Sequence, residues 1–161
     1  MAQINSVTLS LSSVNLSTTG NQYGITNGTF TNMRFDNINM RLLLGDLYGT
    51  YKRFNIALVA EMCSLCNNSE TNLMVKMNGL NFINNAYDNI ENNSTSFVNV
   101  GYIKRGASSV ASISYVQNVY NTFAYSNDIV SINIKLFNNS NVQSTIGFGN
   151  AHFLFVITPI A

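Results

Sequence analysis

The sequence is poor in the charged residues on which nucleic-acid-binding surfaces depend. Only 9% of its 161 residues are charged, against about 25% in a typical soluble domain. The eight Lys and Arg nearly balance the seven Asp and Glu, so the net charge is +1. Without a basic excess to neutralise a phosphate backbone, direct nucleic-acid binding is not expected. Disorder is not expected either, because 46% of the residues are hydrophobic and disordered chains contain few such residues.

Residues that build metal and catalytic sites are equally scarce. The only histidine, His152, lies in an apolar run without a cysteine nearby, so the motif Cys63-Ser64-Leu65-Cys66 lacks partners for a zinc site. A redox role for this motif would need a βαβ context, and we interpret it as two reduced thiols or an incidental pair. The carboxylates are scattered singly, at Asp36, Asp46, Glu61, Glu70, Asp88, Glu91 and Asp128. We therefore expect no enzyme, no cofactor, and no catalytic, cofactor-binding or metal-binding residues.

The printed sequence also lacks the residue patterns by which targeting and linker segments are recognised. The start of the chain has no positive region followed by an apolar stretch, so we expect no secretion through a signal peptide. The longest apolar run, residues 153–157, is far shorter than the about 20 residues of a membrane helix, so no membrane span is expected. With one proline and no proline-rich linker, residues 1–161 are predicted to form a single domain.

What the sequence has in abundance is apolar–polar alternation with a period of two, which predicts half-buried β-strands. The clearest run places one apolar set on a single expected face: Phe54, Ile56, Leu58, Ala60 and Met62. A second run does the same with another set: Val130, Ile132, Ile134 and Leu136. In all, eight strands are predicted, at about residues 5–16, 34–44, 53–63, 72–77, 97–104, 110–117, 129–137 and 151–158.

Turns and a central strand complete the predicted architecture. Asn- and Gly-rich dipeptides such as Asn78-Gly79 separate the strands and tolerate the left-handed backbone of tight turns. The last strand is apolar on both faces, as expected of a central strand, and the only proline, Pro159, is placed after it. Residues 80–91 have helical spacing but many asparagines, which favours an irregular loop or one short helix. The fold class is therefore an all-β antiparallel β-sandwich, with an eight-stranded single jelly roll as first choice.

The scarcity of charge also bears on assembly. Charged residues are depleted at the cores of protein–protein interfaces, and a surface with little charge is poorly protected against self-association. We therefore expect the protein to form a homo-oligomer in which neighbouring subunits cover much of its surface. Because tyrosine is enriched at interfaces, loop-like tyrosines are the candidate contact residues: Tyr48, Tyr51, Tyr87 and Tyr120.

A short single β-sandwich with Asn- and Ser-rich loops resembles the single-jelly-roll capsid proteins of viruses. The matching parts are the strands at 53–63 and 129–137 and the closing run Phe153–Pro159. Many capsid proteins of small viruses carry an Arg-rich N-terminal arm, whereas the first basic residue here is Arg34. The resemblance implies a structural virion protein, at a vertex (penton) or as a minor shell component, of a virophage-like or giant-virus-like double-stranded DNA virus. It also implies assembly in the host cell, with copies of itself, a pentamer favoured, and other capsid proteins as partners.

Two other functions compete with this interpretation. One is a binding module, either lectin-like or a trimeric tumour-necrosis-factor-like jelly roll that recognises a glycan or a receptor. The absence of tryptophan weakens it, because sugar sites often use tryptophan for stacking. The other is a small cupin-like or glycosidase-like enzyme. Cupins need several histidine ligands and this chain has one, while glycosidases need two opposed carboxylates.

Overall fold

The computed structural model describes residues 5–12, 32–64, 72–84, 97–104, 112–138 and 150–161. Of these residues, 75% lie in β-strands, so the expected all-β class is confirmed. The strands, in chain order, are β1 (Val7–Ser12), β2 (Asn32–Asn39), β3 (Arg53–Ser64), β4 (Asn72–Asn78), β5 (Asn81–Asn84), β6 (Val98–Lys104), β7 (Ser112–Asn118), β8 (Asn121–Ala124), β9 (Ile129–Asn138) and β10 (Asn150–Ile160). A short helix α1 (Met40–Leu44) and a 3₁₀ turn η2 (Gly45–Leu47) connect β2 to β3.

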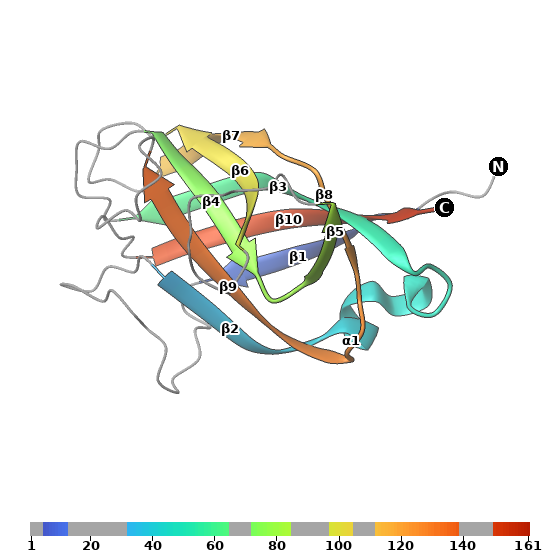
Figure 1. Ribbon diagram of the computed structural model, residues 1–161. Helices are drawn as coiled ribbons and strands as arrows, with labels where there is room; N and C mark the ends of the chain where they lie inside the picture. The colour runs from blue at the N-terminus through green and yellow to red at the C-terminus, as the bar shows by residue number, and fades with distance from the viewer. Residues whose placement is uncertain (1–4, 13–31, 65–71, 85–96, 105–111, 139–149) are drawn as a thin grey trace.

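The strands form two antiparallel five-stranded sheets, which confirms the expected sandwich (Figure 1). The first sheet has the order β1-β10-β3-β8-β5 and the second has the order β2-β9-β4-β6-β7. One pairing, between β3 and β7, joins the two sheets. The strands β1 and β2 are the two ends of the path that runs through this joint. The described part of the sandwich is therefore closed by strand pairing on one side and has edge strands on the other.

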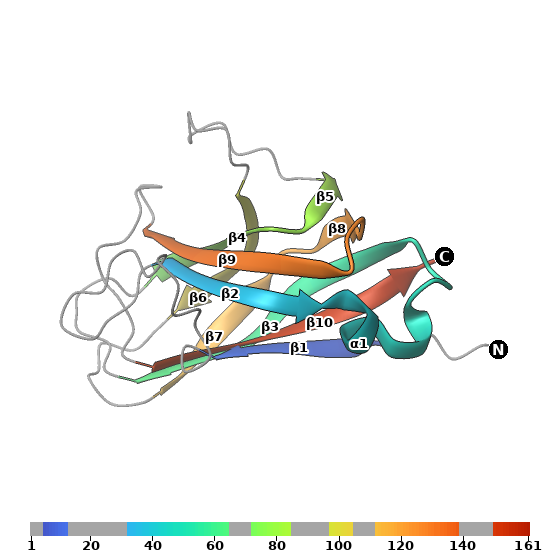
Figure 2. The same ribbon diagram turned by 90° about the horizontal axis from the view of Figure 1, so that it is seen from below.

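The two sheets face each other (Figure 2). The core between them is built by alternating residues of both sheets. On β9 the predicted apolar face points inward: Ile132, Ile134 and Leu136 are fully buried, and Val130 at the end of the strand is partly buried. The strand β10 pairs with β1 on one side and β3 on the other, so the predicted central position of the last strand is also confirmed. Its inward residues Phe153 and Phe155 are fully buried.

The predicted face of the 53–63 strand is wrong beyond Leu58. Phe155 pairs with Leu58, but Leu154 pairs with Ala60, so Val59 is an extra residue that forms a β-bulge. Because a bulge moves every following side chain to the opposite face, Met62 points outward and is 44% exposed. Glu61 takes the inward position instead and is fully buried.

The strand predicted over 34–44 ends at Asn39, and a helix takes its place. The Asn39 side chain accepts a hydrogen bond from the Leu42 backbone N–H at 3.1 Å and so caps α1. Met40 and Leu44, one helical turn apart, are both buried, while Leu42 is 80% exposed. The alternation of apolar residues was therefore a coincidence of the i, i+4 spacing.

Other differences concern strand number and bounds. The structure has ten strands among the described residues rather than eight, because β5 and β8 were not predicted. Residues 81–84, within the segment predicted as a loop or helix, form β5, and 85–91 lie outside the described residues. The first strand begins at Val7 rather than at residue 5, and its predicted end at 13–16 also lies outside them.

Pro159 lies inside β10 and not after it. It pairs with Phe54 of β3, whereas the pairing of β10 with β1 ends at Ile157. Pro159 is therefore paired on one side only among the described strands, and a sheet accepts proline where no partner needs its N–H. None of the helices in the described segments is long and apolar enough to cross a membrane.

Candidate functional site

A group of interacting side chains lies at the end of the sandwich that carries α1. We call Arg41, Tyr48, Tyr125 and Asp128 the tyrosine cluster. The rings of Tyr48 and Tyr125 stack with their centroids 4.8 Å apart. The Tyr48 hydroxyl donates a hydrogen bond to Asp128 Oδ1, and Arg41 Nη2 lies 3.5 Å from Asp128 Oδ2. The cluster therefore connects α1 and the chain after η2 to the turn between β8 and β9.

Backbone contacts hold the same connection in place. The Met40 N–H donates to the Asp128 carbonyl at 2.7 Å, and the Gly49 N–H donates to the Tyr125 hydroxyl at 2.8 Å. The Arg41 guanidinium lies 5.0 Å from the centre of the Tyr48 ring, a cation–π contact. These contacts join α1, the chain after η2 and the β8–β9 turn, and the side chains of Leu42 and Ile129 are exposed at this end of the sandwich.

The predicted interface tyrosines fall in different places. Tyr48 and Tyr51 are half-buried and pack against the core at this end. Tyr120 precedes β8, at the opposite end of that strand from Tyr125, and is 69% exposed. Tyr87 lies outside the described residues. The structure therefore brings Tyr48 and Tyr51 together and leaves Tyr120 separate, while their role in an interface stays a prediction.

The electrostatics of the cluster centre on Tyr48. The hydrogen bond to the Asp128 carboxylate raises the pKa of Tyr48 above the ordinary value of 10.0, and partial desolvation adds to the rise, against the opposing effect of Arg41. The protonated hydroxyl is the hydrogen-bond donor. Because the folded-state pKa of Tyr48 is raised, the stabilisation from this contact is complete below pH about 10 and is lost as the pH rises through the raised value.

An absorbance titration of phenolate formation tests whether the pKa of Tyr48 is raised. We expect the native protein to contain a tyrosine that ionises above the ordinary range. In Asp128→Asn, which keeps all eight tyrosines, the pKa of Tyr48 should fall back toward 10. In Tyr48→Phe, which keeps the stacked ring, the titration component that ionises above the ordinary range should be missing. A component that persists in Tyr48→Phe would contradict the assignment.

The residues considered for chemistry do not converge. Cys63 lies in β3, whereas Cys66 is outside the described residues. His152 is half-buried on β10 and pairs with Met62. Asp36 accepts hydrogen bonds from Arg34 Nε at 2.7 Å and from the Ser131 hydroxyl at 2.6 Å. Within the described residues, no three His, Cys, Asp or Glu side chains gather into a possible metal site.

Two lysines on the outer face of the second sheet were missed by sequence reasoning. Lys76 is 1% exposed, and its Nζ lies 4.1 Å from the centre of the Phe137 ring. Lys135, opposite Lys76 in the pairing of β4 with β9, places its Nζ 4.4 Å from the centre of the Phe97 ring. A desolvated cation–π contact contributes about 2 kcal/mol. Alternation alone marks these positions as outward and therefore as solvated, so it does not predict that Lys76 is covered and Lys135 half-buried.

The sheet edges differ in how they are protected. Natural proteins protect edge strands with charges, bulges or proline. On β2 the register shifts between Phe35 and Ile38, and Arg34 and Asp36 form an ion pair. On β1 all six residues keep a regular register with β10, and its sequence VTLSLS has no charge. At the other edge of the same sheet, β5 has the uncharged sequence NFIN, with Ile83 45% exposed, and its register with β8 shifts between Phe82 and Asn84.

No protein-family model matches the chain, and no curated protein matches it significantly.

Proposed function

We propose that this protein is a structural subunit of a virion, a single-jelly-roll capsid protein that assembles with copies of itself as a vertex or minor shell component. Its mechanism is assembly through the flanks of the sandwich. The observation that carries the proposal is the strand order, combined with two described edge strands of one sheet that contain no charged residue.

The strand order supports a jelly roll. If β5 is left aside and the consecutive strands β7 and β8 are counted as one bent strand, the chain has eight strands. In chain order they are arranged as 1-8-3-6 in the first sheet and 2-7-4-5 in the second. This order agrees with that of two Greek keys in a jelly roll and so supports the proposed fold type. The fold alone does not imply a function, so the edges matter.

The two edges of the first sheet favour ring formation. A closed ring needs a heterologous interface, in which one surface of each subunit meets a different surface of the next. The strands β1 and β5 are such a pair, because they lie at opposite edges of one sheet and both are uncharged. Addition of β1 of one copy to β5 of the next would extend the sheet from subunit to subunit by β-augmentation.

Light scattering across a concentration series tests the proposal. We expect the native mass to be a multiple of 17.7 kDa, with five copies as the predicted number. Ser10→Lys on β1 and Ile83→Lys on β5 both add a charge to an exposed edge position, and each variant alone should stay monomeric. Ser126→Lys, in the exposed turn after β8, is the matched control and should assemble like the native chain.

A mixture of the two edge variants sharpens the test. The Ser10→Lys chain keeps an intact β5 edge, and the Ile83→Lys chain keeps an intact β1 edge. One native contact can therefore form between the two chains, and the mixture should contain a dimer that neither variant forms alone. A native protein that stays monomeric at every concentration would rule out the assembly function. Edge variants that keep the native mass would rule out the β1–β5 contact.

A further inference from the structure

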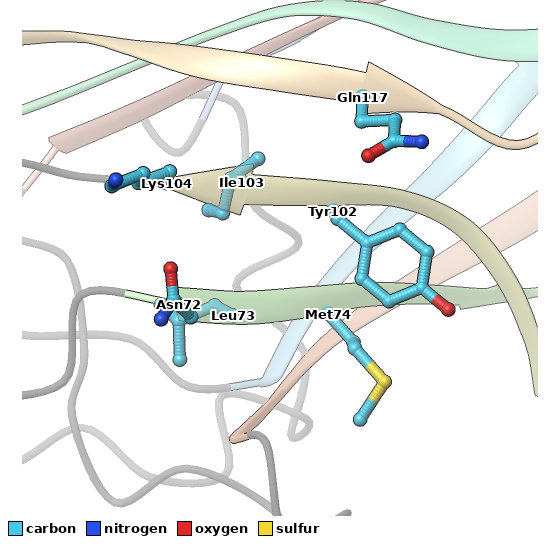
Figure 3. Close-up of a pocket in the computed structure, with 7 residues that line it drawn as sticks. All are labelled: Asn72, Leu73, Met74, Tyr102, Ile103, Lys104 and Gln117. Carbon is cyan, nitrogen blue, oxygen red and sulfur yellow. The ribbon is translucent and has the colours of Figure 1, made fainter.

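A depression of about 440 Å³ lies on the outer face of the second sheet, over β4, β6 and β7 (Figure 3). This volume is in the range of roughly 300–1,000 Å³ in which small-molecule sites fall. Its outward side chains are Asn72, Met74, Tyr102, Lys104 and Gln117. The depression is separate from the tyrosine cluster and from both edges of the first sheet.

Strand register places these side chains in two rows. Met74 pairs with Tyr102, and Tyr102 pairs with Gln117 on the next strand. Two residues further along, and therefore on the same face, Asn72 pairs with Lys104. Figure 3 shows the Tyr102 ring beside the Met74 side chain, with Asn72 and Lys104 at the other end. The site thus has an apolar, aromatic end and a polar end that carries a cation.

The chemistry of this surface points to a carbohydrate. Tyr102 is 45% exposed, so the ring can stack on the C–H face of a sugar. The amides of Asn72 and Gln117 each offer both donors and acceptors to hydroxyl groups. Lys104 supplies three donors and the only formal charge among the described lining residues. A sugar that bears a carboxylate matches this arrangement better than a neutral one.

A peptide strand fits the same surface poorly. Peptides that add to a sheet bind through unpaired main-chain groups at an edge. The depression lies on a face instead, and its central strand β6 is paired with β4 on one side and β7 on the other. Recognition must therefore come from side chains. The chain has no tryptophan, and the Tyr102 ring can take the stacking role that tryptophan often has at sugar sites.

We propose that the Tyr102–Lys104 depression binds an acidic glycan, with Tyr102 as the stacking platform and Lys104 as the partner of the carboxylate. The inference does not depend on assembly, because none of these residues belongs to β1 or β5.

Saturation-transfer NMR with 3′-sialyllactose and with lactose tests the proposal on the full chain. We expect the sialylated sugar to bind more tightly than lactose. Tyr102→Thr, which keeps a β-branched residue in the strand, should weaken binding by about tenfold. Lys104→Gln should remove the preference for the acidic sugar and leave lactose binding unchanged. Tyr120→Ala removes another exposed tyrosine and should bind like the native protein.

Several results would overturn the proposal. Absence of binding to either sugar by the native protein is one. Equal binding by the native protein and Tyr102→Thr is another, and an acidic preference that survives Lys104→Gln is a third. The native mass of both variants, measured in the same samples, should equal that of the unaltered protein. A change of binding with an unchanged mass therefore reports on the depression alone.

Discussion

Replacement of Gly79 by alanine should destabilise the protein by about 3–5 kcal/mol. Gly79 follows β4 with φ +106°, a backbone conformation that L residues rarely adopt. A Cβ at this position would lie 1.9 Å from the Ser131 carbonyl oxygen and 2.9 Å from the Ser131 carbonyl carbon. Both atoms belong to the backbone of β9, beside the fully buried Ile132. Neither Gly79, at the end of β4, nor the Ser131 backbone of β9 can move away without disrupting the second sheet.

Urea unfolding measures this cost, and Gly49→Ala is the matched control. Gly49 also has a positive φ, +81°, but nothing lies within 4 Å of a Cβ built there. Gly49→Ala should therefore show only the backbone strain, about 1–2 kcal/mol. The difference between the two variants isolates the close approach of the turn to β9. If both variants lose the same stability, the close approach contributes nothing.

Local sequence patterns predicted the strands well where one face is buried and the register is regular. The alternation over 129–137 gave the inward face of β9, and the apolar run at the C-terminus gave the central position of β10. The Asn78-Gly79 turn was likewise predicted from residue types that tolerate a positive φ. In each case a few neighbouring residues determine the structure.

Predictions from the sequence were wrong where pairing with a second strand determines which way the side chains point. The bulge at Val59 depends on how β3 matches β10, and period-two alternation contains no signal for it. Without the bulge, Glu61 would point outward. For α1, a local signal was available and was overridden by the alternation: Asn39 is a favourable N-cap, and Met40 and Leu44 have helical spacing.

The candidate sites could be predicted only in part, because their residues come from distant segments. Tyr48 was singled out as a contact residue, but its partner Asp128 is 80 residues further along the chain. The same holds for the depression, where Met74, Tyr102 and Gln117 become neighbours only through the pairing of three strands. Composition and spacing cannot show such groupings, since strand order is a tertiary property.

The second large effect is expected for Asn121→Asp, at the point where the chain leaves β7 and enters β8. The Asn121 side chain is 1% exposed, and its Nδ2 donates to the Asn99 carbonyl at 2.7 Å and to the Val119 carbonyl at 3.4 Å. An aspartate has the same shape but no N–H, so a carboxylate would face two carbonyl oxygens in a buried site. We expect a loss of about 3–5 kcal/mol at pH 7.

The pH dependence of this loss identifies its cause. Burial and the absence of a donor raise the folded-state pKa of a carboxyl group at position 121 above the ordinary value of about 3.9. A group with a raised folded-state pKa favours the folded state at low pH, and its contribution is lost as the pH rises. The variant should therefore recover stability as the pH falls from 7 toward about 4. Urea unfolding at several pH values, relative to the native protein, measures the recovery.

Asn55→Asp on the adjacent β3 is the control for Asn121→Asp. The Asn55 Oδ1 accepts a hydrogen bond from the Thr122 hydroxyl at 2.9 Å, and a carboxylate accepts the same bond, so we expect a cost below about 1 kcal/mol. Equal costs for the two variants, or no pH dependence, would contradict the role assigned to the Asn121 amide.

Both large effects fall at points where the chain passes from the second sheet to the first: Gly79 lies between β4 and β5, and Asn121 begins β8. Since β5 is held by β8 alone among the described strands, these two residues determine whether the first sheet presents the β5 edge on which the proposed assembly depends.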